Sequence, residues 1–286
     1  MGCGSYTSSD WKRFASTRSI SDTSNERELF KAREVNPKYN PANFAFRESR
    51  DNDEHPHSTP IAIGLDVTGS MGYLPAHIIK NGLNELMKKL YASNVIPDPQ
   101  LMFAACGDYC DNAPLQVTQF ESDIRIAEQL ADLWLEGGGC GNYGEDYQLF
   151  WYFLGEKTKT DAFEKRGEKG FAFTIGDEPV HDRTYDDTFK YVFGDTKETM
   201  KTSTIADICA KKYELFHINI NNGWGKNDDQ IPGRTLQIDE DEVDRLPELI
   251  IAVMCQVRGI DRTAILGDLD DTFNAWLDER LKTLII

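Results

Sequence analysis

The sequence predicts an α/β protein in which a doubly wound, mostly parallel sheet lies between helices. Short apolar runs of strand length alternate with amphipathic patterns of helical period from residue 60 to residue 286. Several of the runs are apolar at consecutive positions, as expected for strands buried on both faces. Because ligand sites in such sheets lie at the carboxyl ends of the strands, the residues after each run are the candidate functional residues.

The first half of this region begins with the apolar run 61–65, which stops at Asp66. Apolar residues at helical spacing then predict a helix over 74–90. The remaining elements expected before the glycine-rich stretch at 137–144 are a buried strand at 101–105, a shorter strand at 115–120 and an amphipathic helix at 123–135.

The second half continues the alternation of helices and strands. A buried strand is expected at 171–175, and it runs directly into Gly176 and Asp177. The other expected elements are helices at 145–154, 204–213, 246–257 and 263–284 and a strand at 215–220.

Residues 1–59 differ from the rest because they are rich in Ser, Asn, Arg and Pro and show no sustained period of 2 or 3.6. We expect an extended polar N-terminal arm, followed by one domain over residues 60–286. The sequence leaves open whether the arm packs on the domain.

Charge and hydropathy exclude several classes of function. The 31 Lys and Arg against 48 Asp and Glu give a formal net charge of −17, and no basic stripe offers a surface for nucleic acid. No apolar run reaches the ~20 residues of a membrane helix, and no signal-peptide pattern opens the chain. We therefore expect a cytoplasmic protein with neither a nucleic-acid nor a membrane partner.

The six cysteines are sparse for this length, which favours free thiols in a reducing compartment. A zinc site from Cys106, Cys110 and Cys140 is conceivable, but without a paired CxxC motif unliganded thiols are the preferred interpretation.

Oxygen-bearing side chains follow the ends of three predicted strands. Asp66, Thr68 and Ser70 stand at every second position of one tight loop, Asp108 follows the second buried strand, and Asp177 follows 171–175. Hard divalent cations such as Mg²⁺ prefer oxygen ligands of this kind. A loop that only caps the next helix would also use Ser and Thr, but the recurrence of Asp177 at the same sheet edge favours a metal site. His181 lies close enough in sequence to line it.

The Asp66-Val67-Thr68-Gly69-Ser70-Met71-Gly72 loop resembles the metal-ion-dependent adhesion site (MIDAS) of von Willebrand factor A (VWA) domains. The resemblance also extends to an uncharacterised bacterial and phage branch with a similar polar arm. It implies metal ligation by Asp66, Thr68 and Ser70 and by Asp177 in the third loop. The second loop departs from the pattern, since Asn142 or Tyr143 stands near the usual Thr, and Asn142 is our expected ligand.

This resemblance implies a non-enzymatic scaffold or adaptor that captures a partner's Asp or Glu through bound Mg²⁺, with Mn²⁺ or Ca²⁺ as alternative ions. It suggests partners such as AAA+ ATPases of the MoxR type.

A second interpretation is an enzyme. Asp66-Val67-Thr68-Gly69-Ser70, with Gly176-Asp177, also resembles the motifs of haloacid-dehalogenase-like phosphotransferases, in which Asp66 would be the nucleophile. Val67 replaces the lysine of the ATPases in that family, and the glycine-rich loop would have no role. We therefore prefer the binding protein.

Overall fold

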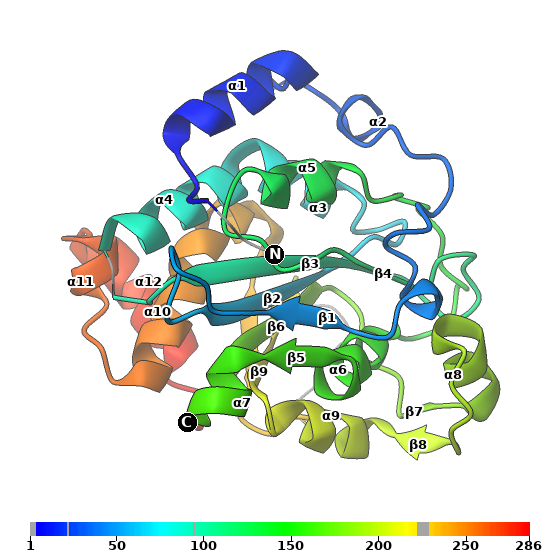
Figure 1. Ribbon diagram of the computed structural model, residues 1–286. Coiled ribbons are helices and arrows are strands. Elements are labelled where there is room, and N and C mark those ends of the chain that lie inside the picture. The colour runs from blue at the N-terminus through cyan, green and yellow to red at the C-terminus, as the bar shows by residue number, and fades with distance from the viewer. Residues whose placement is uncertain (1–3, 22, 94, 222–228) are drawn as a thin grey trace.

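A six-stranded sheet forms the centre of the molecule, which is described here from a computed structural model covering residues 4–21, 23–93, 95–221 and 229–286 (Figure 1). The strand order is β10-β9-β6-β2-β3-β4, and all neighbours are parallel except β3 and β4. The predicted doubly wound, mostly parallel α/β fold is therefore confirmed. The strands are β2 (Thr59–Asp66), β3 (Pro99–Cys106), β4 (Leu115–Val117), β6 (Gly170–Gly176), β9 (Tyr213–Ile220) and β10 (Thr235–Ile238).

Alternate residues of the central strands enter two separate cores. Ile61, Ile63 and Leu65 of β2 join one core, whereas Ala62 joins the other. Every residue of β2, β3 and β6 is buried, as the continuous apolar runs predict. The first core is covered by α3 (Tyr73–His77), the π-helical turn η2 (Ile78–Gly82), α4 (Leu83–Ser93), α5 (Arg125–Ala131) and α10 (Leu246–Arg258); the second is covered by α6 (Tyr147–Glu156), α8 (Asp186–Phe193) and α9 (Thr202–Ala210).

Shorter elements surround this body. Strands β1 and β5 pair in parallel, and β7 and β8 pair antiparallel. These elements are β1 (Arg47–Ser49), β5 (Thr158–Thr160), β7 (Arg183–Thr184), β8 (Met200–Lys201), α7 (Asp161–Arg166), the 3-10 helix η4 (Glu240–Arg245), α11 (Thr263–Leu266) and α12 (Asp271–Leu281). Among the residues that the structure describes, every helix is too short or too polar to cross a lipid bilayer.

The polar N-terminal segment packs on the domain, which the sequence left open. It contains α1 (Ser8–Arg18), α2 (Glu26–Leu29) and the 3-10 helix η1 (Pro41–Asn43). Trp11 and Phe14 of α1 are buried in the first core, and the Tyr6 hydroxyl donates a hydrogen bond to Asn84 on α4. Apolar residues are few in this segment, but they are large, so burying them offsets the cost of ordering it.

The C-terminal region differs from its prediction. The expected helix over 263–284 is divided into α11 and α12 because Gly267 adopts a positive φ of 69° and Asp270 caps α12 through the Phe273 amide. Strand β10 was not predicted, since four residues of alternating burial give too weak a pattern.

The order of the strands reverses direction between β2 and β6. The chain passes from β2 to β3 and β4 on one side, and then crosses over to β6, β9 and β10 on the other. Asp66 is the last residue of β2, and Asp177 directly follows β6. This topological switch point is where open α/β sheets bind ligands.

His217 should make the fold sensitive to acid. It is fully buried on β9, and burial lowers its pKa to about 3, whereas in the unfolded chain it would titrate near 6.5. Between these values only the unfolded state binds the proton, so stability falls as pH falls below about 6.5. We expect His217 to remove about 2 kcal/mol of unfolding free energy between pH 7 and pH 5.

Urea unfolding at the two pH values measures this effect. The variant His217→Asn can keep a hydrogen bond to Thr174, whose Oγ1 lies 2.9 Å from Nδ1 of His217, but it cannot titrate. The difference between the two pH values should therefore shrink in the variant. An unchanged difference would show that acid sensitivity comes from other groups.

Candidate metal site

The first loop holds Asp66 in a fixed orientation at the end of β2. Asp66 is fully buried, and its Oδ1 accepts hydrogen bonds from the Thr68 amide (2.8 Å) and the Thr68 hydroxyl (2.6 Å). Its Oδ2 accepts a bond from the Tyr147 hydroxyl (2.5 Å). The carboxylate is thus positioned by partners on both sides, as ligands of metal sites usually are.

Ser70 and Asp177 meet at the same edge of the sheet. The Ser70 hydroxyl donates to Asp177 Oδ1 at 3.2 Å, although the two residues are 107 positions apart in the chain. Ser70 is exposed and Asp177 is half-buried, so this end of the site is open to solvent. The structure therefore brings together four of the five predicted ligands.

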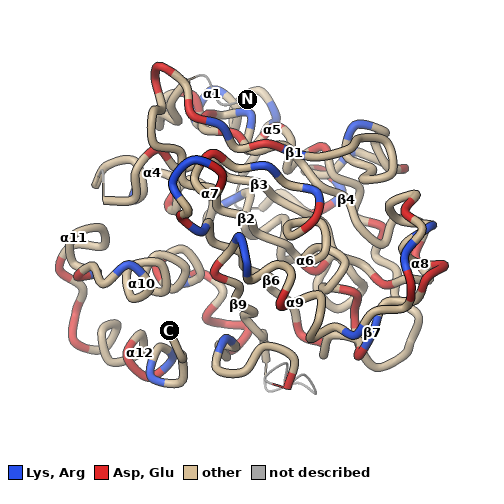
Figure 2. The backbone as a smooth tube through the Cα atoms, turned by 60° about the horizontal axis from the view of Figure 1, so that its bottom comes forward, with Lys and Arg blue, Asp and Glu red and all other residues tan. Residues whose placement is uncertain are grey.

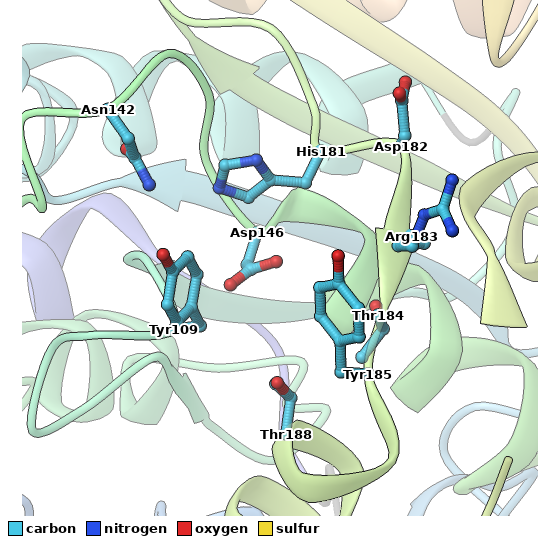
Figure 3. Close-up of a pocket in the computed structure, with 9 residues that line it drawn as sticks. All are labelled: Tyr109, Asn142, Asp146, His181, Asp182, Arg183, Thr184, Tyr185 and Thr188. Atoms are coloured by element: carbon cyan, nitrogen blue, oxygen red, sulfur yellow. The ribbon is translucent and has the colours of Figure 1, made fainter. Parts of the chain in front are cut away.

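Asn142, the fifth predicted ligand, lines a pocket with Asp146 and His181 (Figure 3). Its side chain also interacts with Asp108. The candidate in the neighbouring position, Tyr143, is 78% exposed. That Asn142 or Tyr143 is a ligand of the Asp66 site stays a prediction.

Two residues that follow the glycine loop lie near Asp66 and were not among the predicted site residues. Tyr147, the first residue of α6, donates to Asp66, and Glu145 is buried, with its Oε2 accepting no hydrogen bond from the described residues. Tyr147 lies in the helix expected over 145–154, and the apolar pattern of that helix does not show which of its side chains reaches Asp66. Glu145 and Asp146 form a Glu-Asp pair directly after the glycine loop, and this pair of acids is the sequence feature that points to Glu145.

The site is electrostatically negative. Burial, together with the nearby charge of Asp177, raises the pKa of Asp66 to about 6 despite the hydrogen bonds from Thr68 and Tyr147. Burial also raises the pKa of Asp177, and burial with the charges of Asp66 and Asp108 raises that of Glu145 to about 10. Each raised pKa records a cost of keeping the carboxylate charged, and a cation near these groups would lower that cost.

The residues present fit a hydrated divalent ion. Asp66 and Asp177 offer carboxylate oxygens, and Thr68 and Ser70 offer neutral hydroxyls. Only the two carboxylates of this set are charged, and the set contains neither sulfur nor imidazole. Such ligands suit Mg²⁺ with several retained waters better than a softer metal.

The cysteine prediction is wrong for one pair. Cys110 and Cys140 form a disulfide, joining the loop after β3 to the glycine loop, with Cα atoms 6.0 Å apart. Cys106, Cys209 and Cys255 are buried free thiols, as expected. The loops that carry Cys110 and Cys140 lie far apart in sequence, so their proximity depends on the sheet order and could not be deduced from spacing. The conceivable zinc site is excluded as long as these two sulfurs are bonded to each other.

Comparison with known proteins gives weak structural similarities. No family model and no curated protein match the chain. A structure of proximal thread matrix protein 1 from the mussel byssus, with a zinc-occupied MIDAS motif, aligns at 13% identity and a TM-score of 0.47, covering 69% of this chain and 48% of its own.

Two other solved structures are also similar. The pilus adhesin SpaC from Lactobacillus rhamnosus GG aligns at 9% identity and a TM-score of 0.43, covering 68% of this chain and 30% of its own. A von Willebrand factor type A protein from Catenulispora acidiphila aligns at 12% identity and a TM-score of 0.35, covering 66% and 42%. This chain thus spans less than half the length of each of these proteins, and similarity at this level assigns no activity. The solved structures that resemble the chain include VWA domain proteins, as the sequence motif predicts, whereas the bacterial and phage branch stays a prediction.

Proposed function

We propose that this chain is a non-enzymatic binding protein that holds Mg²⁺ at Asp66, Thr68, Ser70 and Asp177, with Asn142 as the expected second-loop ligand. The observation that carries the proposal is the contact between Ser70 and Asp177 beside the buried Asp66, at the switch point of the sheet. A bound Mg²⁺ would supply a positive centre that accepts one more oxygen ligand. The exposed side of Ser70 leaves room for a carboxylate from another protein.

The charge of the chain supports the need for a cation in this interaction. The net charge is −17, and Figure 2 shows basic residues interspersed with acidic ones along the chain. An acidic partner would be repelled without a bridging ion. The partner class is therefore a protein that presents Asp or Glu, and AAA+ ATPases of the MoxR type are the candidates that the VWA resemblance suggests.

The cytoplasmic location is part of this proposal, and the Cys110–Cys140 disulfide is the observation that counts against it. Disulfides persist mainly in oxidising compartments. Fractionation of the producing cells, with the bond followed by non-reducing peptide mapping, distinguishes a reduced cytoplasmic form from an oxidised form elsewhere.

Metal-dependent capture should be abolished by Asp66→Ala combined with Ser70→Ala. These changes remove two ligands, while β2 stays held by the core on both faces. Losing the hydrogen bonds to Asp66 destabilises the fold, whereas removing its buried charge stabilises it. Because these effects oppose each other, the free energy of unfolding should change by less than about 2 kcal/mol. Affinity capture with Mg²⁺ and with a chelator, read by mass spectrometry, measures the effect.

The matched control is Asp187→Ala, which removes an exposed acid on α8, away from the switch point. In Mg²⁺, wild type and this control should capture the same proteins. These proteins should be absent when chelator is added and when the double variant is used. If the double variant retains them at wild-type level, the metal site is not the binding surface.

The second-loop ligand is tested separately by Asn142→Ala and Tyr143→Phe. We expect Asn142→Ala to weaken Mg²⁺ binding in calorimetry by about tenfold, since a neutral ligand is lost and water can replace it. An effect of Tyr143→Phe alone would assign the ligand to Tyr143. If neither change affects Mg²⁺ binding, the second loop contributes to the site through Glu145 and Tyr147 instead.

A further inference from the structure

A second group of ligand-type side chains lies beside the first site and has no role in the proposed function. Asp108 follows β3, Asp146 precedes α6, and His181 lies between β6 and β7. One carboxylate or imidazole ligand atom from each lies within 4.8 Å of the other two. His181 Nε2 lies 3.0 Å from Asp108 Oδ1, at hydrogen-bonding distance.

The two carboxylates are buried, and one oxygen of each accepts no hydrogen bond from the residues that the structure describes. Asp108 is fully buried and Asp146 is 2% exposed. Asp108 Oδ1 accepts a hydrogen bond from the Tyr109 amide, and Asp146 Oδ1 accepts one from Gln148. Oδ2 of Asp108 and Oδ2 of Asp146 accept none from the described residues. Buried carboxylate oxygens are normally paired, because leaving them bare costs several kcal/mol.

The cluster faces a pocket that gives access from solvent. The pocket has a volume of about 580 Å³, and its lining includes Asp146, His181, Tyr109 and Tyr185. Figure 3 shows the His181 ring and the Asp146 carboxylate near each other at the pocket wall, whereas the Asp182 side chain points away from them. An ion held by the cluster would therefore have one side open to water or a ligand.

The surrounding structure holds the cluster in place. The Cys110–Cys140 disulfide ties the loop that carries Asp108 to the glycine loop that leads to Asp146. The Asp146 amide donates to the Gly107 carbonyl, and the His181 amide donates to the Glu145 carbonyl. Main-chain bonds thus link all three segments, as expected for a preorganised ligand set.

We propose that Asp108, Asp146 and His181 bind a divalent transition-metal ion of the Zn²⁺ class, with an open coordination position toward the pocket. Two ligand atoms at tetrahedral angles around Zn²⁺ lie about 3.3 Å apart. His181 Nε2 and Asp108 Oδ1 are 3.0 Å apart and all three ligand atoms lie within 4.8 Å of one another, so shifts of the side chains alone would reach this spacing. The imidazole distinguishes this site from the all-oxygen site at Asp66, because imidazole favours Zn²⁺ over Mg²⁺. Three protein ligands and one open position are typical of zinc sites that bind a further ligand.

Zinc titration of the full chain tests the proposal. The protein is stripped with chelator and titrated with ZnCl₂ by calorimetry, with Asp66→Ala and Ser70→Ala present to remove the first site. We expect one Zn²⁺ per chain in this background. Adding Asp108→Asn, Asp146→Asn or His181→Gln should weaken binding by more than about 100-fold, since changes beyond the direct ligands already cost about 10- to 100-fold.

Asp182→Asn is the matched control, because it removes the same charge from the same pocket without touching the cluster. Zn²⁺ should raise the unfolding temperature of the background protein and of this control but not of the three ligand variants. Asparagine matches aspartate in shape, so the Asp108→Asn and Asp146→Asn variants should both fold without metal. The proposal is overturned if the background protein binds no Zn²⁺ or if the three ligand variants bind it as the control does. If a variant loses Mg²⁺-dependent capture but still binds Zn²⁺, the change affects the Asp66 site and leaves the zinc site intact.

Discussion

Gly176→Ala should destabilise the protein by about 3 to 5 kcal/mol and abolish Mg²⁺ binding at the Asp66 site. A Cβ atom at position 176 would lie 2.0 Å from the Tyr147 hydroxyl and 2.7 Å from Asp66 Oδ2. Tyr147 is fully buried, so its ring cannot move aside without disturbing the second core. The expected cost combines overpacking with loss of a hydrogen bond to a charged group. Urea unfolding and Mg²⁺ calorimetry measure the two effects.

Gly72→Ala is the matched control for this substitution. A Cβ atom there would meet only the Thr68 carbonyl oxygen, at 3.8 Å, and the backbone is already helical. We expect no loss of stability. Tyr147→Phe combined with Gly176→Ala removes the closest contact, so the two changes together should cost less than the sum of their separate effects. Strict additivity would show that the clash with the hydroxyl is not the cause.

Replacing Cys110 and Cys140 by Ser should cost about 3 to 4 kcal/mol of unfolding free energy. The bond closes a loop with a sequence separation of 30, and the chain-entropy relation for a loop of this length gives that value. Unfolding curves of wild type and the double variant, recorded without reductant, measure the difference.

Reductant provides the control for the disulfide. Dithiothreitol should lower the stability of wild type toward that of the double variant and leave the variant unchanged. Cys106, Cys209 and Cys255 are buried free thiols in both proteins, so reductant should not change them. If wild type and the variant unfold alike without reductant, the bond does not contribute to stability.

The sequence was sufficient for the central strands and for part of the site. Residues 61–65 and 171–175 are continuous apolar runs, so the strands and the positions of Asp66 and Asp177 at their ends could be predicted. The Ser70–Asp177 contact follows from these two strands being neighbours in a parallel sheet.

The rest of the site depends on contacts between segments without periodic patterns. The glycine loop has no repeat that fixes which residue faces Asp66, so Tyr147 and Glu145 were missed. Asp108, Asp146 and His181 come from three loops separated by whole elements, and only the folded chain brings them together. The burial of Trp11 and Phe14 was also hidden, since α1 is mostly polar and its few apolar residues are enough to anchor it.

Diffraction from crystals grown with Mn²⁺ would show whether an ion binds at the Asp66 site, because Mn²⁺ substitutes for Mg²⁺ at oxygen sites and gives an anomalous signal. We expect an anomalous peak between Ser70 Oγ and the Asp177 carboxylate, next to Asp66, that is absent from crystals of the Asp66→Ala and Ser70→Ala double variant. A wild-type map without a peak at this edge of the sheet, under conditions where Mn²⁺ is saturating, would contradict this expectation.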